Sequence, residues 1–277
     1  LALGMLRLRS TRFASLRTLS TSASPRSRPT QLSVFEQAKI PLACNTLGQV
    51  STPRVESVLS SLVRYSLVEG VPVIKLPDPA VFRRFENQEM HVDVLSNESL
   101  AQGSSLVVGF THPTPLVQVF RELGVFPPRT VVVGKLVRTG HSVAEQARQQ
   151  GLDDSDGSLL YTVAARTAMF VDVFGERTRM QFDAMNSAYE DPLAADQHAL
   201  LDWLNGVKGS DFLCRAVSHV LQVTLQEGYV YYVDRYLMKV FGKVAEEKWG
   251  RFSVGFLNEV TTAEDLRREI DILENEM

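Results

Sequence analysis

Few residues of this chain have the types and the spacing that chemistry requires. The sequence contains no phosphate-binding glycine-rich loop, no G-x-S-x-G and no H-E-x-x-H. The histidines are dispersed, with no i, i+4 pair to bind a metal from one helix face: they are His91, His112, His141, His198 and His219. We therefore expect no enzyme, no metal and no cofactor, although a catalytic dyad assembled only by the fold would leave no local signature.

Two further groups invite a chemical interpretation. Cys44 and Cys214 are the only cysteines and lie far apart, which supports neither a disulfide framework nor a zinc site, so we interpret both as small buried apolar residues. Residues 153–157 (DDSDG) resemble a calcium loop, but they lack the alternating ligands and the distant Glu that such a loop requires. We expect a polar loop that caps a helix.

The first thirty residues differ from the remainder in composition. They contain six arginines and no acid, the first carboxylate being Glu36, and they are rich in Ser and Thr with regularly spaced Leu. This composition is typical of a mitochondrial transit peptide. The alternative is a disordered basic arm that binds nucleic acid. We expect residues 1–30 to be a cleavable presequence that directs the protein to the mitochondrial matrix.

Charge is distributed unevenly along the remaining chain. The formal net charge of −3 becomes −9 when the six arginines of residues 1–30 are subtracted. Residues 31–151 carry 11 Lys+Arg against 10 Asp+Glu, and residues 152–277 carry 12 against 22. A near-neutral first half and an acidic second half suggest two roles, and any contact with nucleic acid is expected in the first half.

Sequence patterns in the first half predict alternating strands and helices. We expect a helix that opens at Pro53 and ends at Gly70, because Ser51-Thr52-Pro53 with Glu56 forms a capping pattern. Strands are expected at 40–44, 71–76, 106–110 and 130–136, and further helices at 82–85, 116–123 and 142–150. The predicted unit is an α/β sandwich domain over residues 31–175.

Everything beyond residue 157 suggests helices. The expected helices are 158–174, 177–189, 194–205, 211–249 and 262–277, the last capped by Thr261 or Thr262. The predicted fold class is thus α+β, an N-terminal α/β sandwich domain followed by an all-helical C-terminal region over residues 176–277. No run of eighteen apolar residues predicts a membrane span.

Basic residues of the first half could form a phosphate-binding patch. Lys75 ends a predicted strand, Arg83 and Arg84 follow on the next helix, and Lys39 and Arg54 flank the predicted first strand. Phosphate binding by such a patch would be sensitive to salt. The alternative is that these side chains simply solvate the surface.

Three stretches resemble a known family. Residues 71–84 place a strand ending in Lys75 before a helix with Arg83 and Arg84; residues 102–123 join a glycine-led strand to a helix; residues 130–145 repeat the unit. This order of elements resembles the stalk-base protein of the large ribosomal subunit, ribosomal protein L-ten, in its mitochondrial form.

The resemblance implies a structural, non-catalytic role in the mitochondrial ribosome. The α/β domain would bind large-subunit rRNA beside a neighbouring stalk-base protein, with the five basic residues as candidate contacts. A C-terminal helix would anchor dimers of the acidic stalk protein, which recruit translational GTPases.

The predicted helix 211–249 is the candidate partner site. It is apolar over more than half its circumference, so both sides must be covered. Either the neighbouring helices bury it in a bundle, or one side stays open and takes up helices of the stalk protein. The candidate partner-binding residues are Val217, Leu221, Val233, Leu237, Val240 and Phe241.

A second functional hypothesis fits the same general features. Supernumerary subunits of inner-membrane respiratory or ATP synthase complexes are also imported, non-catalytic and helix-rich. Co-migration distinguishes the two hypotheses: a ribosomal protein sediments with large subunits at low salt, whereas such a subunit is extracted by detergent with a membrane complex.

Overall fold

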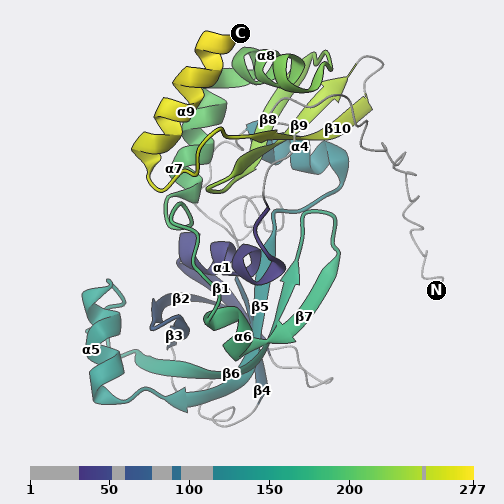
Figure 1. The fold of residues 1–277 in the computed structure, drawn as a ribbon. Helices are drawn as coiled ribbons and strands as arrows, with labels where there is room; N and C mark the ends of the chain where they lie inside the picture. Colours follow the sequence, from purple (N-terminus) through teal and green to yellow (C-terminus); the bar gives the residue numbers. More distant parts are fainter. Residues whose placement is uncertain (1–30, 52–59, 77–88, 95–114, 245–247) are drawn as a thin grey trace, which may run out of the picture.

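The computed structural model describes residues 31–51, 60–76, 89–94, 115–244 and 248–277. For residues 51, 60, 61, 89–94 and 115 it describes the backbone alone. Within these ranges the chain forms two units, which lie one above the other in Figure 1. The proposed presequence, residues 1–30, lies outside the described part.

The lower unit is built on one antiparallel sheet that curls back on itself. The strand order is β3-β2-β1-β4-β5-β6-β7, and β3 pairs additionally with β6, from Val73 opposite Thr162 to Leu76 opposite Leu159. We call this the curled sheet. Its strands are β1 Leu47–Ser51, β2 Ser60–Val68, β3 Val71–Leu76, β4 Glu89–Val94, β5 Arg129–Arg138, β6 Leu159–Val171 and β7 Arg177–Gln181.

Two helices fill the concave side of the curled sheet. Helix α1 (Val34–Cys44) and the short α6 (Phe182–Asn186) pack against residues such as Tyr65, Leu136 and Phe170, all buried. A capping box fixes the start of α1, because the Ser33 hydroxyl accepts from the Glu36 N–H while the Glu36 carboxylate accepts from the Ser33 N–H. Helix α5 (His141–Gln149) covers β2 from outside.

The upper unit contains a three-stranded antiparallel sheet in the order β10-β9-β8. One face packs on four helical segments, and Figure 1 shows α8 above this sheet, α9 to its left and α4 (Pro115–Leu123) below it. The strands are β8 Glu227–Val233, β9 Leu237–Val244 and β10 Lys248–Gly255; the helical segments are α7 Gln197–Asp202, the π-helix η3 Trp203–Lys208, α8 Gly209–Leu221 and α9 Ala263–Glu276.

A third apolar cluster joins the two units. Ile40 of α1, Phe120 of α4 and Tyr231, Tyr232 and Phe241 of the three-stranded sheet are all buried in it. Both faces of the three-stranded sheet are therefore covered, one by α7, α8 and α9 and the other by α1 and α4. The units share a continuous apolar interface.

The predicted fold class is wrong. The C-terminal region is not all-helical, because the described part of residues 211–249 contains most of α8, the strands β8 and β9 and the first two residues of β10. Residues 158–174, expected as a helix, form β6, and 177–189 divide into β7 and α6. The first unit is a curled antiparallel sheet and not an α/β sandwich.

Two elements of the first half also differ from expectation. Residues 40–44 belong to α1 and not to a strand, because the capping box at Ser33 starts a helix that continues through them. The helix expected to end at Gly70 is wrong from Ser60 onward: Val63 and Tyr65 are buried while Leu62 and Arg64 are exposed, which is the two-residue period of β2. Residues 52–59 lie outside the described part.

The remaining predictions divide into confirmed elements and elements outside the described residues. Strands 71–76 and 130–136 and helices 116–123, 142–150 and 262–277 are confirmed as β3, β5, α4, α5 and α9 within one or two residues. Of the helix expected at 194–205, residues 197–205 are helical in α7 and η3, and residues 194–196 form a turn. The expected elements at 82–85 and 106–110 are not among the described residues. None of the described helices is long and apolar enough to span a membrane.

Candidate functional site

A hollow opens at the junction of the two units. We call it the junction hollow. Its enclosed volume is about 50 Å³, and with the open mouth included the hollow covers about 490 Å³. Helices α1, α4 and α7 and strand β8 form its walls: the lining includes Ile40, Pro41, Cys44, Asn45, Leu116, Phe120, Gln197, His198, Leu201, Tyr231 and Tyr232. The lining is mostly apolar and contains no Lys, Arg, Asp or Glu.

Three polar side chains meet at the end of α1. The Asn45 amide nitrogen donates to the Pro41 carbonyl at 2.7 Å and to the Cys44 sulfur at 3.2 Å. The Asn45 amide oxygen lies 3.0 Å from Nε2 of His198 on α7. Because an amide oxygen only accepts, Nε2 must carry the proton, and a neutral His198 then has its lone pair on Nδ1. Asn45 thereby fixes both the tautomer and the position of the imidazole ring.

The floor of the junction hollow is held by hydrogen bonds to the backbone. The Gln197 amide donates to the Val233 carbonyl at 2.7 Å and accepts from the Val233 N–H at 3.0 Å. These bonds fix α7 on β8, so His198, the next residue, is placed by a rigid element. Tyr231 stacks on Phe241 with ring centroids 4.1 Å apart. Burial raises the pKa of the Tyr231 and Tyr232 hydroxyls, which keeps both neutral.

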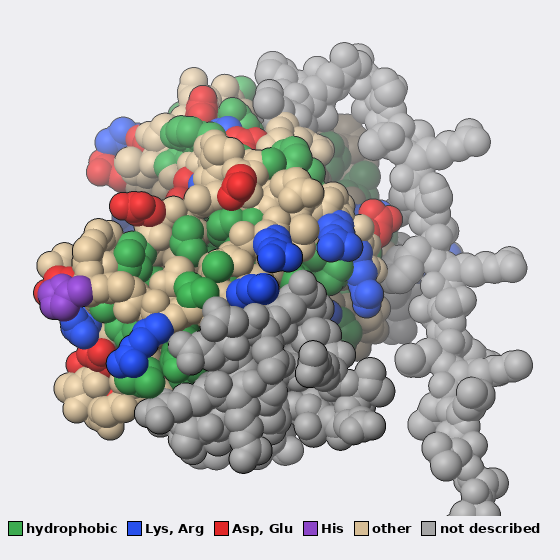
Figure 2. Space-filling model, turned by 90° about the horizontal axis from the view of Figure 1, so that it is seen from below, with side chains coloured by type: hydrophobic (Ala, Val, Ile, Leu, Met, Phe, Trp, Pro, Cys, Tyr) green, Lys and Arg blue, Asp and Glu red, His purple; other side chains and the backbone are tan. Residues whose placement is uncertain are grey.

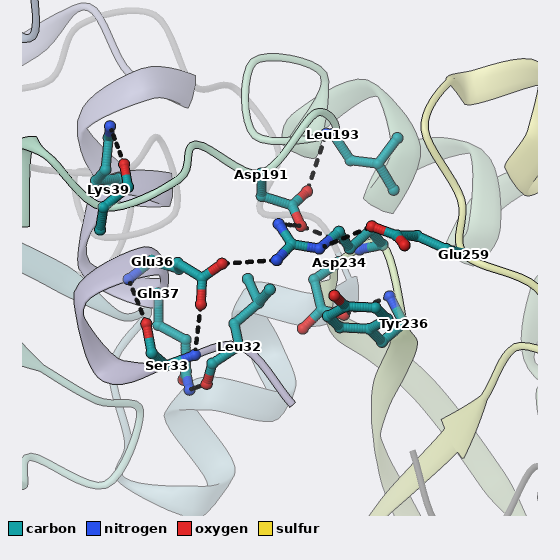
Figure 3. Close-up of polar contacts among 12 residues, drawn as sticks. Leu32, Ser33, Glu36, Gln37, Lys39, Asp191, Leu193, Asp234, Tyr236 and Glu259 are labelled. Atoms are coloured by element: carbon teal, nitrogen blue, oxygen red, sulfur yellow. Dashed lines mark hydrogen bonds and ion pairs between the residues drawn. The ribbon is translucent and has the colours of Figure 1, made fainter. Parts of the chain in front are cut away.

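An ion cluster lies beside the junction hollow and also joins the two units (Figure 3). Arg235, in the turn between β8 and β9, has only 8 % of its side chain exposed. Its guanidinium lies 2.6 Å from the Glu36 carboxylate, 3.2 Å from Glu259 and 3.8 Å from Asp191. The Asp191 carboxylate also accepts from the Arg235 backbone N–H at 3.1 Å. We call these four residues the Arg235 cluster.

The charges of the Arg235 cluster respond differently to their surroundings. Burial raises the pKa of Asp191, and the N–H donors and Arg235 only partly offset it. For Glu36 burial also acts upward, but hydrogen bonds from Ser33 and Arg235 outweigh it and lower the pKa. Through Glu36 and Asp191 the cluster ties the start of α1 to the segment that precedes α7. Asn45 follows α1 and His198 lies on α7.

The structure describes two of the five basic residues predicted to bind rRNA, Lys39 and Lys75. Lys39 is largely buried in α1 and donates to the carbonyls of Asn186 and Ala188 at 3.1 and 2.9 Å. Lys75 on β3 pairs with Asp156 at 2.9 Å. Both cations thus have partners within the protein. Arg54, Arg83 and Arg84 lie outside the described residues.

The residues predicted to bind a partner are mostly internal. Val217 on α8 and Val233 and Val240 on the strands lie in the core of the upper unit, with Leu221 partly buried against it. Leu237 and Phe241 lie in the cluster that joins the units. The segment predicted as one helix thus folds as α8, β8 and β9, and its apolar side chains are covered within the protein.

The other sequence interpretations have mixed outcomes. Both cysteines are partly buried and carry no disulfide. Residues 153–157 form a polar turn in which Asp153 and Asp156 accept hydrogen bonds from Ser155 and Ser158, but the turn leads into strand β6 and does not cap a helix as expected. Among the described residues, no group of three or more His, Cys, Asp or Glu is placed to hold a metal ion. His198 and Asn45 lie 153 positions apart and share no local motif that would mark the junction hollow in the sequence.

Comparison with known proteins relates the fold to solved structures. No protein-family model and no curated protein matches the chain. A heme-binding protein from Mycobacterium smegmatis superposes with a TM-score of 0.56 at 18 % identity, over 89 % of this chain and 98 % of that one. This likeness shows a shared fold.

Two further structures superpose less well. A protein of unknown function from Agrobacterium tumefaciens gives a TM-score of 0.32 at 13 % identity, over 89 % of this chain and 98 % of that one. ChuZ of Campylobacter jejuni gives 0.33 at 12 % identity, over 53 % and 58 %.

Proposed function

We propose that this chain is a non-catalytic ligand-binding protein of mitochondria, that the junction hollow is its site, and that heme is its ligand. The observation that carries the proposal is the presence of an oriented imidazole, His198, and a thiol, Cys44, in an otherwise apolar hollow. Imidazole and thiolate are two of the side chains that hold heme iron. The fold shared with a heme-binding protein directs the choice of ligand.

The donor set fits heme better than the size of the enclosed space does. The enclosed volume of about 50 Å³ is far below the roughly 300–1,000 Å³ of ligand pockets, so the walls of the hollow would have to move apart to admit heme. The lining contains no cation to pair with the carboxylates of heme.

His198 is the stronger candidate to hold the iron. Asn45 orients its ring and fixes the proton on Nε2. Nδ1 is the basic nitrogen of the neutral form and is buried, so the ring would have to turn or its neighbours shift before Nδ1 could hold the iron. The Cys44 sulfur accepts a hydrogen bond from Asn45 at 3.2 Å, which makes this thiol the second candidate to hold the iron. Bound heme would supply a redox-active or gas-binding iron, while the residues of this chain bind and orient it and exclude water.

Titration of the purified chain with hemin tests the proposal. We expect saturable binding of one hemin per chain, with a shifted Soret band, and about tenfold weaker binding in His198→Ala because the side chain that holds the iron is removed. His219→Ala, an exposed histidine on α8, is the matched control and should bind as the unmodified chain does. Circular dichroism checks that each variant is folded. Absence of saturable binding would overturn the proposal. So would a result in which His198→Ala and the double variant His198→Ala/Cys44→Ser both bind hemin as tightly as the unmodified chain.

The ribosomal stalk-base function stays a prediction. The helix expected to anchor stalk dimers is replaced by α8 and the three-stranded sheet. The proposed anchoring of stalk dimers therefore has no structural basis in this region. The mitochondrial location is supported by the composition of residues 1–30.

A further inference from the structure

Four cationic side chains lie along neighbouring strands at one side of the curled sheet. They are Lys135 on β5, Arg166 on β6 and Arg177 and Arg179 on β7, and all are exposed. None forms an ion pair with a described residue, whereas Arg148, Arg235 and Arg268 all do. Figure 2 shows Lys and Arg side chains gathered on the lower face of the molecule with few acidic side chains among them. We call these four residues the basic track.

Strand register places the basic track in a line. Lys135 lies opposite Ala164, Arg179 opposite Met169 and Arg177 opposite Val171, so the cations follow β6 from Ala164 to Val171. Arg166 is the extra residue of the bulge between the pairs Gly134–Ala165 and Val133–Thr167. At about 3.4 Å per residue the line is about 24 Å long. In the strand register Lys135 also lies opposite Glu89 of β4.

Protection of a sheet edge does not explain the whole track. Charged residues on an edge strand prevent strand addition, and β7 is an edge strand, so Arg177 and Arg179 alone would fit that role. Lys135 and Arg166 lie on β5 and β6, which are paired on both sides. Exposed cations on interior strands that form no ion pair with a described residue are unexpected in a chain whose net charge outside residues 1–30 is −9, from −3 minus six arginines.

We propose that the basic track binds the phosphates of a single-stranded nucleic acid, a function separate from ligand binding in the junction hollow. A single line of cations matches one phosphate backbone, whereas a duplex presents two. An anionic membrane fits less well, because surface binding is strengthened by apolar side chains that insert. The large apolar side chains that are exposed among the described residues lie elsewhere than on β5, β6 and β7.

Salt dependence is the quantity that tests the basic track. Each phosphate contact to a single strand contributes about −0.7 to the slope of log K against log salt, so four contacts give a slope of about −3. The assay is fluorescence anisotropy of the full chain with labelled oligouridylate. Replacing two cations, Arg177→Gln/Arg179→Gln, should weaken binding at low salt by about tenfold or more and make the slope shallower by about 1.4.

A matched variant controls for net charge. Arg148→Gln/Arg268→Gln removes two exposed arginines outside the basic track. Arg148 is paired with Glu145 and Asp154, and Arg268 is paired with Glu264 and Asp265. The arginines of residues 1–30 are common to all variants, so only differences between variants are interpreted. Equal slopes in the two double variants, or binding to phosphatidylglycerol vesicles without binding to oligouridylate, would overturn the proposal.

Discussion

Asp234 shows how one residue can carry a pH dependence. It is buried, with 1 % exposed, in the turn between β8 and β9, and its Oδ1 accepts from the N–H groups of Tyr236 at 2.8 Å and Leu237 at 3.0 Å. Burial raises the pKa of its carboxyl to about 6, the charge of Asp191 adds to the effect, and the N–H donors oppose it. The folded protein therefore binds a proton at Asp234 over a range in which the unfolded chain, with a pKa of about 4, has released it.

The sign of the linkage follows from that difference. A raised pKa in the folded state gives a stabilising contribution that is present below about pH 4 and is lost as the pH rises through about 6. Two pKa units correspond to about 3 kcal/mol. Asp234→Asn keeps an oxygen for both N–H donors but cannot ionise. From about pH 4 to about pH 7, we expect its free energy of unfolding to rise relative to that of the unmodified protein by up to about 3 kcal/mol.

Urea denaturation at both pH values measures this change. Asp183→Asn, which removes an exposed carboxylate from the first turn of α6, serves as the control and should keep the pH profile of the unmodified protein. A constant difference between Asp234→Asn and the unmodified protein at the two pH values would contradict the prediction.

The candidate site was not predictable from the sequence at the scale of residues. Asn45 ends the first helix and His198 lies in the second helix of the upper unit, and only the packing of α1 against α7 brings them within 3.0 Å. Neither residue belongs to a spaced motif. The two candidate iron ligands are also inconspicuous in the sequence. His198 is one of five dispersed histidines, and Cys44 was interpreted as a buried apolar residue.

At the scale of elements, burial on both faces explains why β8 and β9 were predicted as one helix. Val230 and Val240 point into the core of the upper unit, while Tyr231 and Phe241, the next residues, point into the cluster that joins the units. A strand covered on both faces loses the alternation of apolar and polar residues, and its continuous apolar run cannot be distinguished from a buried helix. Helices with clear caps, such as α9 behind Thr262, were predicted correctly.

The bulge between β5 and β6 depends on one glycine. A Cβ atom at Gly134 would lie 2.5 Å from the Ala164 carbonyl oxygen and 2.7 Å from Ala165 Cα, and both are backbone atoms that cannot move aside. Gly134→Ala should therefore lower the free energy of unfolding by about 2 kcal/mol or more. At Gly206 in η3 an added Cβ would meet nothing within 4 Å, so Gly206→Ala should be neutral or slightly stabilising. Urea denaturation compares the two, and equal stabilities would show that the bulge tolerates a side chain.

At the scale of the whole molecule, the Arg235 cluster connects segments that are far apart in the chain. Arg235 and Glu36 are 199 positions apart, and Tyr189 and Tyr236 each place a ring centroid 4.7 Å from the guanidinium carbon. The upper unit thus holds the start of α1, whose other end forms a wall of the junction hollow. Stability of the junction and geometry of the proposed heme site should be coupled through this residue.

Removing Arg235 should weaken the whole junction. Arg235→Gln leaves the buried Asp191 and the half-buried Glu36 without their cation, which typically costs about 3 kcal/mol of unfolding free energy or more. Arg251→Gln is the control, because Arg251 is exposed and lies 4.0 Å from the Phe174 ring centroid, a contact of about 1 kcal/mol at most. In a double-mutant cycle with Glu36→Gln, urea denaturation should give a coupling energy of about 1 kcal/mol or more for the pair. A coupling energy near zero, or a loss no larger than that of Arg251→Gln, would mean that the apolar cluster alone joins the two units.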